Sequence, residues 1–390
     1  MKMTQIYSIV NNMATEMLGD STLVNENLDN IVDIGKEMLD STDIEKFTKT
    51  LLDHIGRVVF VDKYYKGSAP SIVMDSWEFG SVLEKIQADI PVATENKSWD
   101  LTDGTVYEQD TFYKPSVSAK FFNERVTFEV PMSFTEKQVK SAFSNVNQLN
   151  GFFTMISNNI DKAFTIRMDA LVLRTINNMT AQTLHAANPT LAGDVDSPKA
   201  INLLYLYNQR TGKSLTAAKC LADADFIRYC AYAINSQKAR LKQISTQFNV
   251  GGKARFTPEE DVHVVLLGDL VAGSTVYVQA DAFHNDLVAL PKAEIVNFWQ
   301  GSGTDYRFDS ISKIDVTIDV DGTPTTLSTD GILGVMFDSA ACGISCLDRR
   351  VTTHYNARAE FMNNFYKMEV GYYNDLNENF IVFYAKDIQA

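Results

Sequence analysis

The sequence contains no proline between Met132 and Asn188, and apolar residues recur at helical spacing through most of this stretch. Steps of mostly three or four residues separate Phe153, Ile156, Ile160, Phe164, Met168, Leu171, Val172 and Ile176. The pattern predicts a helix from about Leu149 to Met179, roughly 30 residues and about 45 Å long. Asn150-Gly151 is expected to bend or break it. Because globular helices average roughly 11–12 residues, a helix of this length must be supported by packing.

A strand is predicted just before this helical stretch. Val126, Phe128 and Val130 alternate with Thr127 and Glu129, which is the period-2 pattern of a half-buried strand. Pro131 has no N–H to donate and is expected to end the ladder. Ser133 with Glu136 fits a capping box, which predicts the start of a helix there. A strand that leads into a long helix favours an elongated, plate-like protein; the alternative is a long core helix in an ordinary α+β protein.

Residues 80–126 have the pattern of a long hairpin. Leu83, Ile86, Ile90 and Val92 suit an extended arm, and residues 93–113 are polar and rich in turn formers. A two-stranded hairpin is marginally stable by itself, so it should lie on something. A neighbouring subunit is the natural candidate, and the alternative is packing on its own domain.

The remaining chain gives shorter elements. Two or three helices are expected in residues 1–56, followed by a strand at Arg57–Val61. Ser197-Pro198 and Gly212 suit the two ends of a helix, and a second helix is expected at about 223–244. Residues 269–285 fit either a helix or a strand. Further strands are predicted at 262–267, 311–320, 332–337, 341–346, 364–370 and 378–384.

Composition narrows the class of protein. The chain has 390 residues, of which 45% are hydrophobic, and its net charge is −14. An acidic chain lacks the basic footprint of a general nucleic-acid binder, although it suits a wall that encloses nucleic acid without gripping it. Four cysteines are too few for a disulfide scaffold, and no run of 18 apolar residues suggests a membrane span.

Motifs for catalysis or cofactor binding are weak. Thr211-Gly212-Lys213-Ser214 resembles the end of a phosphate-binding loop, but the required glycine five residues before Gly212 is Tyr207. The five histidines are scattered, without a partner at metal-ligand spacing. We therefore expect no catalytic, cofactor-binding or metal site, and a protein that is not an enzyme.

Several strings make the chain resemble a known family. They are Asp348–Asn356, Gly371–Asp375, Asn377–Phe380, Tyr277–Asp281 and Val296–Gly303. Together with the order of hairpin, strand and long helix, they resemble the major capsid proteins of tailed bacteriophages, which share the Hong Kong phage-type capsid fold with encapsulins.

The resemblance implies an α+β fold with an N-terminal arm, an extended hairpin called the E-loop, a P domain with a long spine helix, and an A domain. Its expected divisions are 1–79 (helices and arm), 80–126 (E-loop), 127–212 (P domain), 213–335 (mainly A domain) and 336–390 (returning strands).

The resemblance also implies a structural protein that forms an icosahedral shell around double-stranded DNA. The expected partners are copies of itself in hexamers and pentamers, a scaffolding protein, a portal, decoration proteins and the packaged DNA, with no membrane. The expected location is the virion, after assembly in the host cytoplasm. We expect the hairpin to contact adjacent subunits through Lys97, Trp99, Phe121, Phe122 and Arg125. The alternatives are an encapsulin-like compartment shell and, in a different class, a soluble metabolic enzyme.

Overall fold

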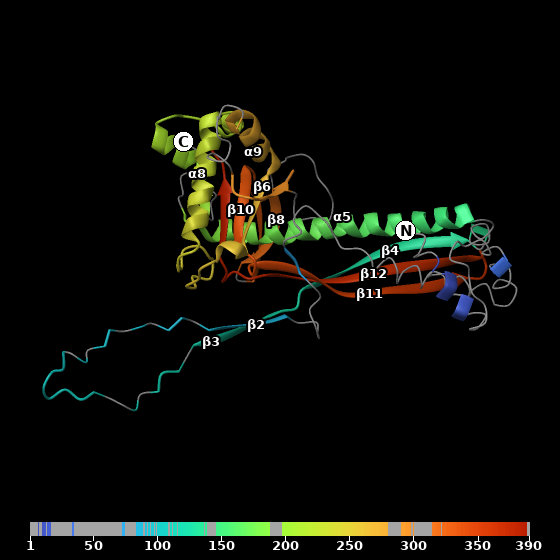
Figure 1. Ribbon diagram of the computed structural model, residues 1–390, viewed down its shortest axis with the longest axis horizontal. Helices are drawn as coiled ribbons and strands as arrows, with labels where there is room; N and C mark the ends of the chain where they lie inside the picture. The colour runs from blue at the N-terminus through green and yellow to red at the C-terminus, as the bar shows by residue number, and fades with distance from the viewer. Residues whose placement is uncertain are drawn as a thin grey trace.

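A computed structural model describes the protein at residues 7, 10–12, 14–16, 33, 34, 72–74, 83–88, most of 90–138, 146–187, 197–279, 290–297, 299, 314–320 and 322–387. The described residues among the first 34 are helical, as predicted. The strand expected at Arg57–Val61 lies outside the described residues. The molecule is elongated, with a compact head at one end of a long helix and sheet, and a hairpin that projects away from both (Figure 1).

The long helix α5 spans Val146–Ala187 and is the axis of the structure. Its 42 residues make it about 63 Å long, which confirms the predicted helix and extends it at both ends. The break expected at Asn150-Gly151 was wrong. Gly151 costs a helix only about 1 kcal/mol, and packing just beyond it, where the rings of Phe152 and Phe134 lie 5.4 Å apart, offsets that cost.

A four-stranded sheet runs along α5, with the strand order β1-β11-β12-β4. Its strands are β1 (Val73–Met74), β4 (Arg125–Thr135), β11 (Cys342–Asn356) and β12 (Phe361–Asn374). The strand predicted at Val126–Val130 is confirmed, but Pro131 does not end it. The reason is topological: β4 is the last strand of the sheet, and an edge strand tolerates a residue without an N–H.

The capping box lies two residues later than expected. Ser133 is inside β4 and bonds Asn363. Instead, the Thr135 N–H donates to Gln138 Oε1 at 3.0 Å, and the Gln138 N–H donates to Thr135 Oγ1 at 3.3 Å. The reciprocal pair is a capping box with glutamine in place of glutamate.

The head contains a five-stranded sheet, with the order β5-β13-β10-β6-β7, and helices that cover it. Its strands are β5 (Ala200–Asn202), β6 (Val262–Leu267), β7 (Glu294–Val296), β10 (Ile332–Asp338) and β13 (Phe380–Tyr384). Its helical elements are α6 (Leu203–Thr211), α7 (Ala217–Cys220), α8 (Ala224–Arg240), η2 (Glu259–Asp261), α9 (Gly268–Gly273) and a π-helical turn η3 (Ser274–Gln279).

In the head, the start of α6 differs from the prediction, and the ambiguity at residues 269–285 is resolved for the described residues. Asn202 caps α6 by accepting the Tyr205 N–H, so Ser197-Pro198 is not the start of that helix. The short strand β5 occupies the intervening residues. The ambiguous stretch 269–285 is helical at its described residues, where α9 continues into η3.

Apolar side chains form two cores. One lies between α5 and the strands that contact it, and the other lies beneath α6, α8 and α9 on the head sheet. A two-stranded ribbon of β8 (Ile314–Val320) and β9 (Thr323–Thr329) also packs on α5. Gly322 provides the turn of this ribbon at φ 80°.

Candidate assembly surface

The projecting hairpin is built from β2 (Leu83–Ala88) and β3 (Val117–Phe122), paired antiparallel. Every described residue from 90 to 119 is solvent-exposed, so the described part of the loop buries little surface against its own chain. Among these residues Phe112 and Tyr113 are each 85% exposed, and Val106 is 86% exposed. Folded soluble chains rarely leave several large apolar side chains open along one segment unless the segment binds something.

The two faces of the hairpin have the opposite polarity to that of a normal surface strand. Register places Glu84, Ile86, Ala88, Val117, Ala119 and Phe121 on one face, which is exposed. On the other face, Lys85, Gln87 and Lys120 point toward the body of the same chain and are partly buried. Ile86 and Phe121 are 66% and 64% exposed on the outward face. The inward face thus combines these three polar side chains with Leu83 and Phe122, while the outward face presents Ile86, Phe121 and other apolar side chains to solvent.

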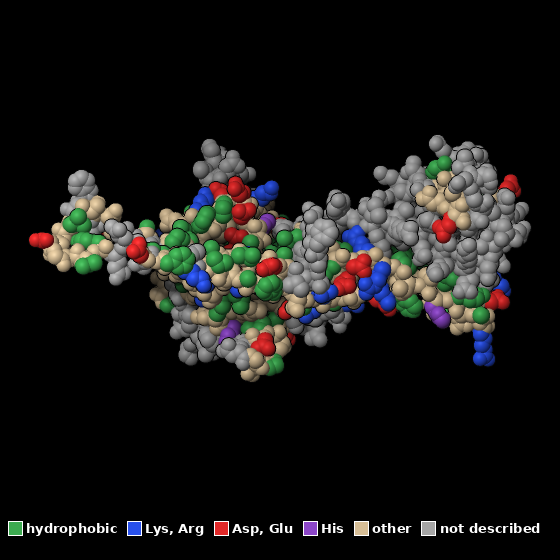
Figure 2. Space-filling model, turned by 90° about the horizontal axis from the view of Figure 1, so that it is seen from below, with side chains coloured by type: hydrophobic (Ala, Val, Ile, Leu, Met, Phe, Trp, Pro, Cys, Tyr) green, Lys and Arg blue, Asp and Glu red, His purple; other side chains and the backbone are tan. Residues whose placement is uncertain are grey.

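Figure 2 shows hydrophobic side chains exposed along the hairpin and on the surface beside its base, with acidic side chains among them near the tip. Residues 89–114 contain six acidic and two basic residues. This mixture of open apolar groups and acidic charge is typical of a surface that docks on a partner while staying soluble beforehand.

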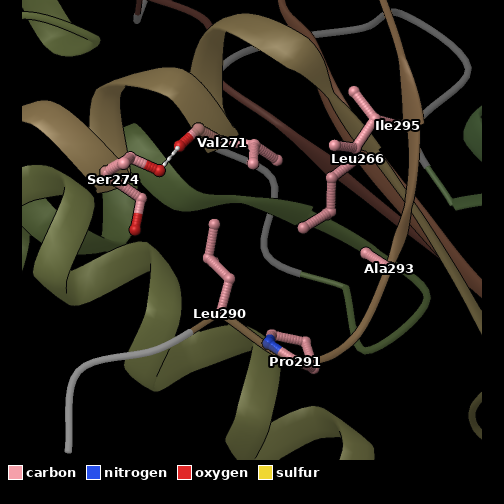
Figure 3. A pocket seen from close by; sticks show the side chains of 8 residues that line it. Leu266, Val271, Ser274, Leu290, Pro291, Ala293 and Ile295 are labelled. Atoms are coloured by element: carbon pink, nitrogen blue, oxygen red, sulfur yellow. Dashed lines mark hydrogen bonds between the residues drawn. The ribbon is translucent and has the colours of Figure 1, made fainter. Parts of the chain in front are cut away.

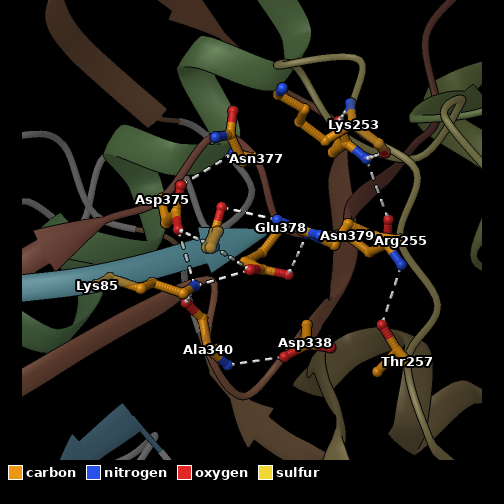
Figure 4. Close-up of polar contacts among 12 residues, drawn as sticks. Lys85, Lys253, Arg255, Thr257, Asp338, Ala340, Asp375, Asn377, Glu378 and Asn379 are labelled. Atoms are coloured by element: carbon orange, nitrogen blue, oxygen red, sulfur yellow. Dashed lines mark hydrogen bonds and ion pairs between the residues drawn. The ribbon is translucent and has the colours of Figure 1, made fainter. Parts of the chain in front are cut away.

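A network of charged groups fixes the base of the hairpin to the body (Figure 4). Lys85 Nζ lies 2.8 Å from Asp375 Oδ2 and 2.8 Å from Glu378 Oε1. From the facing strand, Lys120 Nζ lies 2.9 Å from Asp375 Oδ1. Gln87 Nε2 donates to Glu378 at 2.8 Å, and the Arg255 guanidinium donates to Gln87 Oε1 at 2.7 Å. Both strands of the hairpin are thus tied to the loop that connects β12 to β13.

The Asp375 carboxylate is the centre of this network, and its side chain is 0% exposed. Burial by itself would raise the pKa of this carboxyl, but the hydrogen bonds from Lys85 and Lys120 outweigh burial and lower the pKa. A buried charge with fewer partners would be costly, since desolvation of an ion costs several kcal/mol. The two lysines therefore favour the ionised form of this buried carboxyl.

The sequence-predicted contact residues fall into three groups. Lys97 and Trp99 lie outside the described residues. Phe121 is exposed on the outward face, whereas the Phe122 ring packs 5.0 Å from that of Tyr373 on β12. Arg125 pairs at 3.1 Å with Glu369 of its own chain. An inter-subunit role for Phe122 and Arg125 stays a prediction, and the structure gives both an intramolecular contact.

The ionic network was missed by sequence reasoning. A cation and an amide at Lys85 and Gln87, spaced two apart in an otherwise apolar arm, were the available local signal. Asp375 and Glu378 belong to strings that carried the family resemblance. Their partner Lys85, however, precedes them in the sequence by 290 and 293 residues. A pairing over that separation leaves no local pattern.

Other candidate sites in the described part of the chain carry little chemistry. No group of three or more His, Cys, Asp or Glu side chains gathers there as metal ligands. Gly212, from the phosphate-loop candidate, caps the end of α6 at φ 70°, and Lys213 beside it pairs with Asp225 at 3.1 Å. Among the described helices, none is long and apolar enough to cross a membrane.

A pocket of about 150 Å³ lies in the head between α9, η3 and the strands β6 and β7 (Figure 3). Its lining is mainly apolar, from Leu266, Val271, Ser274, Thr275, Leu290, Pro291, Ala293 and Ile295. Ligand pockets are usually about 300–1,000 Å³, and this one has no ionisable side chain in its lining. It does not compete with the hairpin as the functional feature.

Comparisons with known proteins match the chain to phage capsid proteins. The model of the Phi29-like phage major capsid protein family matches residues 9–384. The capsid structure of Staphylococcus phage Andhra matches with a TM-score of 0.50 and 9% identity, covering 83% of this chain and 86% of that one. The capsid of Cyanophage P-SCSP1u matches with a TM-score of 0.46 and 15% identity, covering 81% and 87%. No curated protein matches the sequence.

The Andhra capsid match shows a shared fold, in agreement with the Hong Kong phage-type α+β architecture expected from the sequence. The family match covers nearly the whole chain, and among the three functions considered it supports the phage shell. The chain belongs to the family of Phi29-like phage major capsid proteins, and it is a structural protein of the virion that assembles into the capsid shell.

Proposed function

We propose that the hairpin of each subunit lies with its apolar face on a neighbouring copy, and that this contact closes the hexamers and pentamers of an icosahedral shell around double-stranded DNA. The observation that supports this is the reversed polarity of β2 and β3. A strand that pointed its apolar face inward would need no partner, whereas Ile86 and Phe121 point away from the body. The open face has the same chemistry as the cores of stable interfaces.

Magnitudes favour a closed ring over an isolated pair of subunits. Burying five large apolar side chains at roughly 1.5–3 kcal/mol each gives on the order of 10 kcal/mol. The five side chains counted are Ile86, Val106, Phe112, Tyr113 and Phe121, and each is more than half exposed. Association costs about 4–15 kcal/mol in lost freedom of motion, so one hairpin contact roughly breaks even. Closure of a ring adds a contact without a further subunit, and the ring is then favoured.

The finer organisation is part of the same proposal. The E-loop comprises residues 80–126, the P domain 127–212 and the A domain mainly 213–335, with an arm at 1–79 and returning strands at 336–390. A scaffolding protein, a portal and decoration proteins complete the particle, which forms in the host cytoplasm without a membrane. The acidic net charge of −14 lets the packaged DNA slide along the wall, because like charges repel.

Deletion of residues 94–111 tests the proposal. We expect the variant to keep the circular dichroism and buried-Trp299 fluorescence of the folded subunit, but to form no closed shells by electron microscopy. Trp299 is 1% exposed and reports on the body. Because the deletion also removes Trp99, the fluorescence reference is the full-length Trp99→Phe subunit. Closed shells of normal size from the deletion variant would overturn the role of the hairpin.

A point variant gives a matched test without loss of chain. Phe121→Ser and Ile86→Ser alter only the outward face, and Gln87→Ser alters the inward face at the neighbouring position. We expect the two outward changes to reduce shell formation while the unassembled subunit stays folded. Wild-type shell yields from both Phe121→Ser and Ile86→Ser would contradict docking through the apolar face, whatever the yield of Gln87→Ser.

A further inference from the structure

We propose that Asp375 is the positioning residue that sets the direction in which the hairpin leaves the subunit, by neutralising two lysines that would otherwise repel each other across the ribbon. The proposal rests on the function proposed for the hairpin, because direction matters only if the hairpin must meet a neighbour. It assigns the geometry of assembly to one carboxylate in the body of the chain.

The first step concerns the hairpin alone. Lys85 and Lys120 are direct cross-strand partners in the register of β2 and β3. Like charges directly opposite each other in an antiparallel pair are destabilising, and a two-stranded ribbon is marginal even without this cost. Over its described residues the ribbon contains six residue pairs. The base of the hairpin therefore needs an anion between the two ammonium groups.

The second step concerns the anion. Each oxygen of Asp375 takes a different strand: Oδ2 receives Lys85 at 2.8 Å, and Oδ1 receives Lys120 at 2.9 Å. A single carboxylate that bridges both strands fixes their position relative to the body as well as to each other. One ion pair on one strand would leave the ribbon free to turn about that contact.

The third step concerns the rigidity of the carboxylate itself. The Asp375 N–H donates to Ala341 O at 2.7 Å, and Asp375 Oδ1 accepts the Asn377 N–H at 3.1 Å. Asp375 also begins a turn of the backbone, in which the Glu378 N–H donates to Asp375 O at 3.2 Å. The backbone at Asp375 is thus hydrogen-bonded to the residue before β11. This bond fixes the direction of the hairpin relative to the long sheet.

The fourth step concerns a supporting contact on one strand. Glu378 accepts from both Lys85 and Gln87, and Arg255 approaches Glu378 at 3.6 Å and donates to Gln87. These groups hold the polar face of β2 against the head. They do not reach Lys120 on β3, which pairs with Asp375. Loss of this one carboxylate should therefore loosen β3, although the contact between Phe122 and Tyr373 remains, and expose the repulsion between the lysines.

The experiment measures the direction of the hairpin in the unassembled full-length subunit. Nitroxide labels at Ala119→Cys on the exposed face of β3 and Thr352→Cys on β11, in a Cys346→Ser background, report the distance between the ribbon and the sheet. The other three cysteines are buried. We expect a narrow distance distribution for the otherwise wild-type subunit and a broad one for Asp375→Asn. A distribution for Asp375→Asn as narrow as that of the reference would overturn the proposal.

A charge-balance rescue separates positioning from general stability. Asp375→Asn with Lys120→Met removes the repulsion between the two lysines but not the missing link to β3, and leaves only Lys85 paired with Glu378. The stability of the subunit should therefore recover, while the distance distribution should stay broad. Glu129→Gln is the control, because it removes an ion pair with Lys367 elsewhere on the sheet. A double variant with a distribution as narrow as that of the wild type would also overturn the proposal, because its ribbon lacks the bridge to β3.

Two further measurements keep the result decisive. If Asp375→Asn does not fold, Lys85→Met tests the same network from the hairpin side, and an unchanged narrow distribution would reject the role. Shell formation by the deletion of 94–111 is scored in parallel. Shells from the deletion variant would reject the proposed function, whereas an unchanged distribution in Asp375→Asn with no shells from the deletion rejects only the role of Asp375.

Discussion

The rings of Phe122 and Tyr373 lie 5.0 Å apart, centroid to centroid, and tilted by 39°, which joins the end of the hairpin to β12. Phe121, the preceding residue in β3, points the other way and is 64% exposed. Successive side chains of a strand lie on opposite faces, so these two phenylalanines have separate tasks. One holds the hairpin on its own subunit, and the other is open to a second copy.

Alanine at these two positions should therefore give opposite phenotypes. Phe122→Ala is expected to lower the free energy of unfolding of the isolated subunit by about 1–3 kcal/mol, since its ring is partly buried against Tyr373. Phe121→Ala should leave that free energy nearly unchanged and reduce shell yield. Urea unfolding and electron microscopy measure the two effects. A larger loss of subunit stability from Phe121→Ala than from Phe122→Ala would contradict the assignment of faces.

The ion pairs at Asp375 predict a pH dependence with a definite sign. Its lowered pKa means that the ionised form is favoured by folding, so its contribution is complete above the unfolded pKa of about 3.9 and is lost as pH falls through the folded value. The stability of the wild type should thus exceed that of Asp375→Asn at neutral pH, and the difference should shrink below about pH 4. Urea unfolding at a series of pH values checks this. A difference that is independent of pH would show that the carboxylate charge is not what stabilises the site.

Two turn glycines allow a matched test of packing in the head. Gly331, at φ 75°, has no room for a side chain because a Cβ there would collide with the Ala385 carbonyl oxygen, while Gly322, at φ 80°, has nothing within 4 Å. Gly322→Ala should cost only the left-handed backbone strain, about 1–2 kcal/mol. Gly331→Ala should cost clearly more, because the β13 end that bonds Gly331 must also move. Thermal unfolding of both variants measures the difference, and equal losses would contradict the predicted collision.

Gly151 offers a stabilising substitution. It lies inside α5, exposed, and a Cβ added there would have nothing within 4 Å. Gly151→Ala should raise the free energy of unfolding by roughly 0.5–1 kcal/mol, because alanine loses less backbone entropy in a helix. Chemical denaturation checks this, with Gly212→Ala, at φ 70°, as a control that should go the other way. A destabilised Gly151→Ala subunit would be the contrary result.

Local patterns predicted the elements of the fold well. Alternation at Val126, Phe128 and Val130 located β4, and helical spacing located α5, because both periodicities follow from backbone geometry. The errors arose where the answer depends on distant parts of the chain. Whether Pro131 ends a strand depends on its place at the sheet edge, which no local pattern reveals.

The candidate surface was predicted in part for the same reason. The hairpin was visible as two extended runs around a polar loop, and its structure agrees with that prediction. Which of Phe121 and Phe122 faces outward depends on the register with β2 and on the contact with Tyr373. The carboxylates that receive Lys85 and Lys120 come from the end of the chain, so only the folded structure brings them together.

The length of α5 has a consequence for the curvature of the particle. The helix contacts strands of the head sheet and of the long sheet, so the two sheets are fastened to one stiff rod and cannot swivel freely past each other. A helix that joins both sheets in this way makes each subunit nearly rigid. If the hairpin docks on a neighbour as proposed, differences in bending between five-fold and six-fold surroundings would then be absorbed at the contacts between subunits.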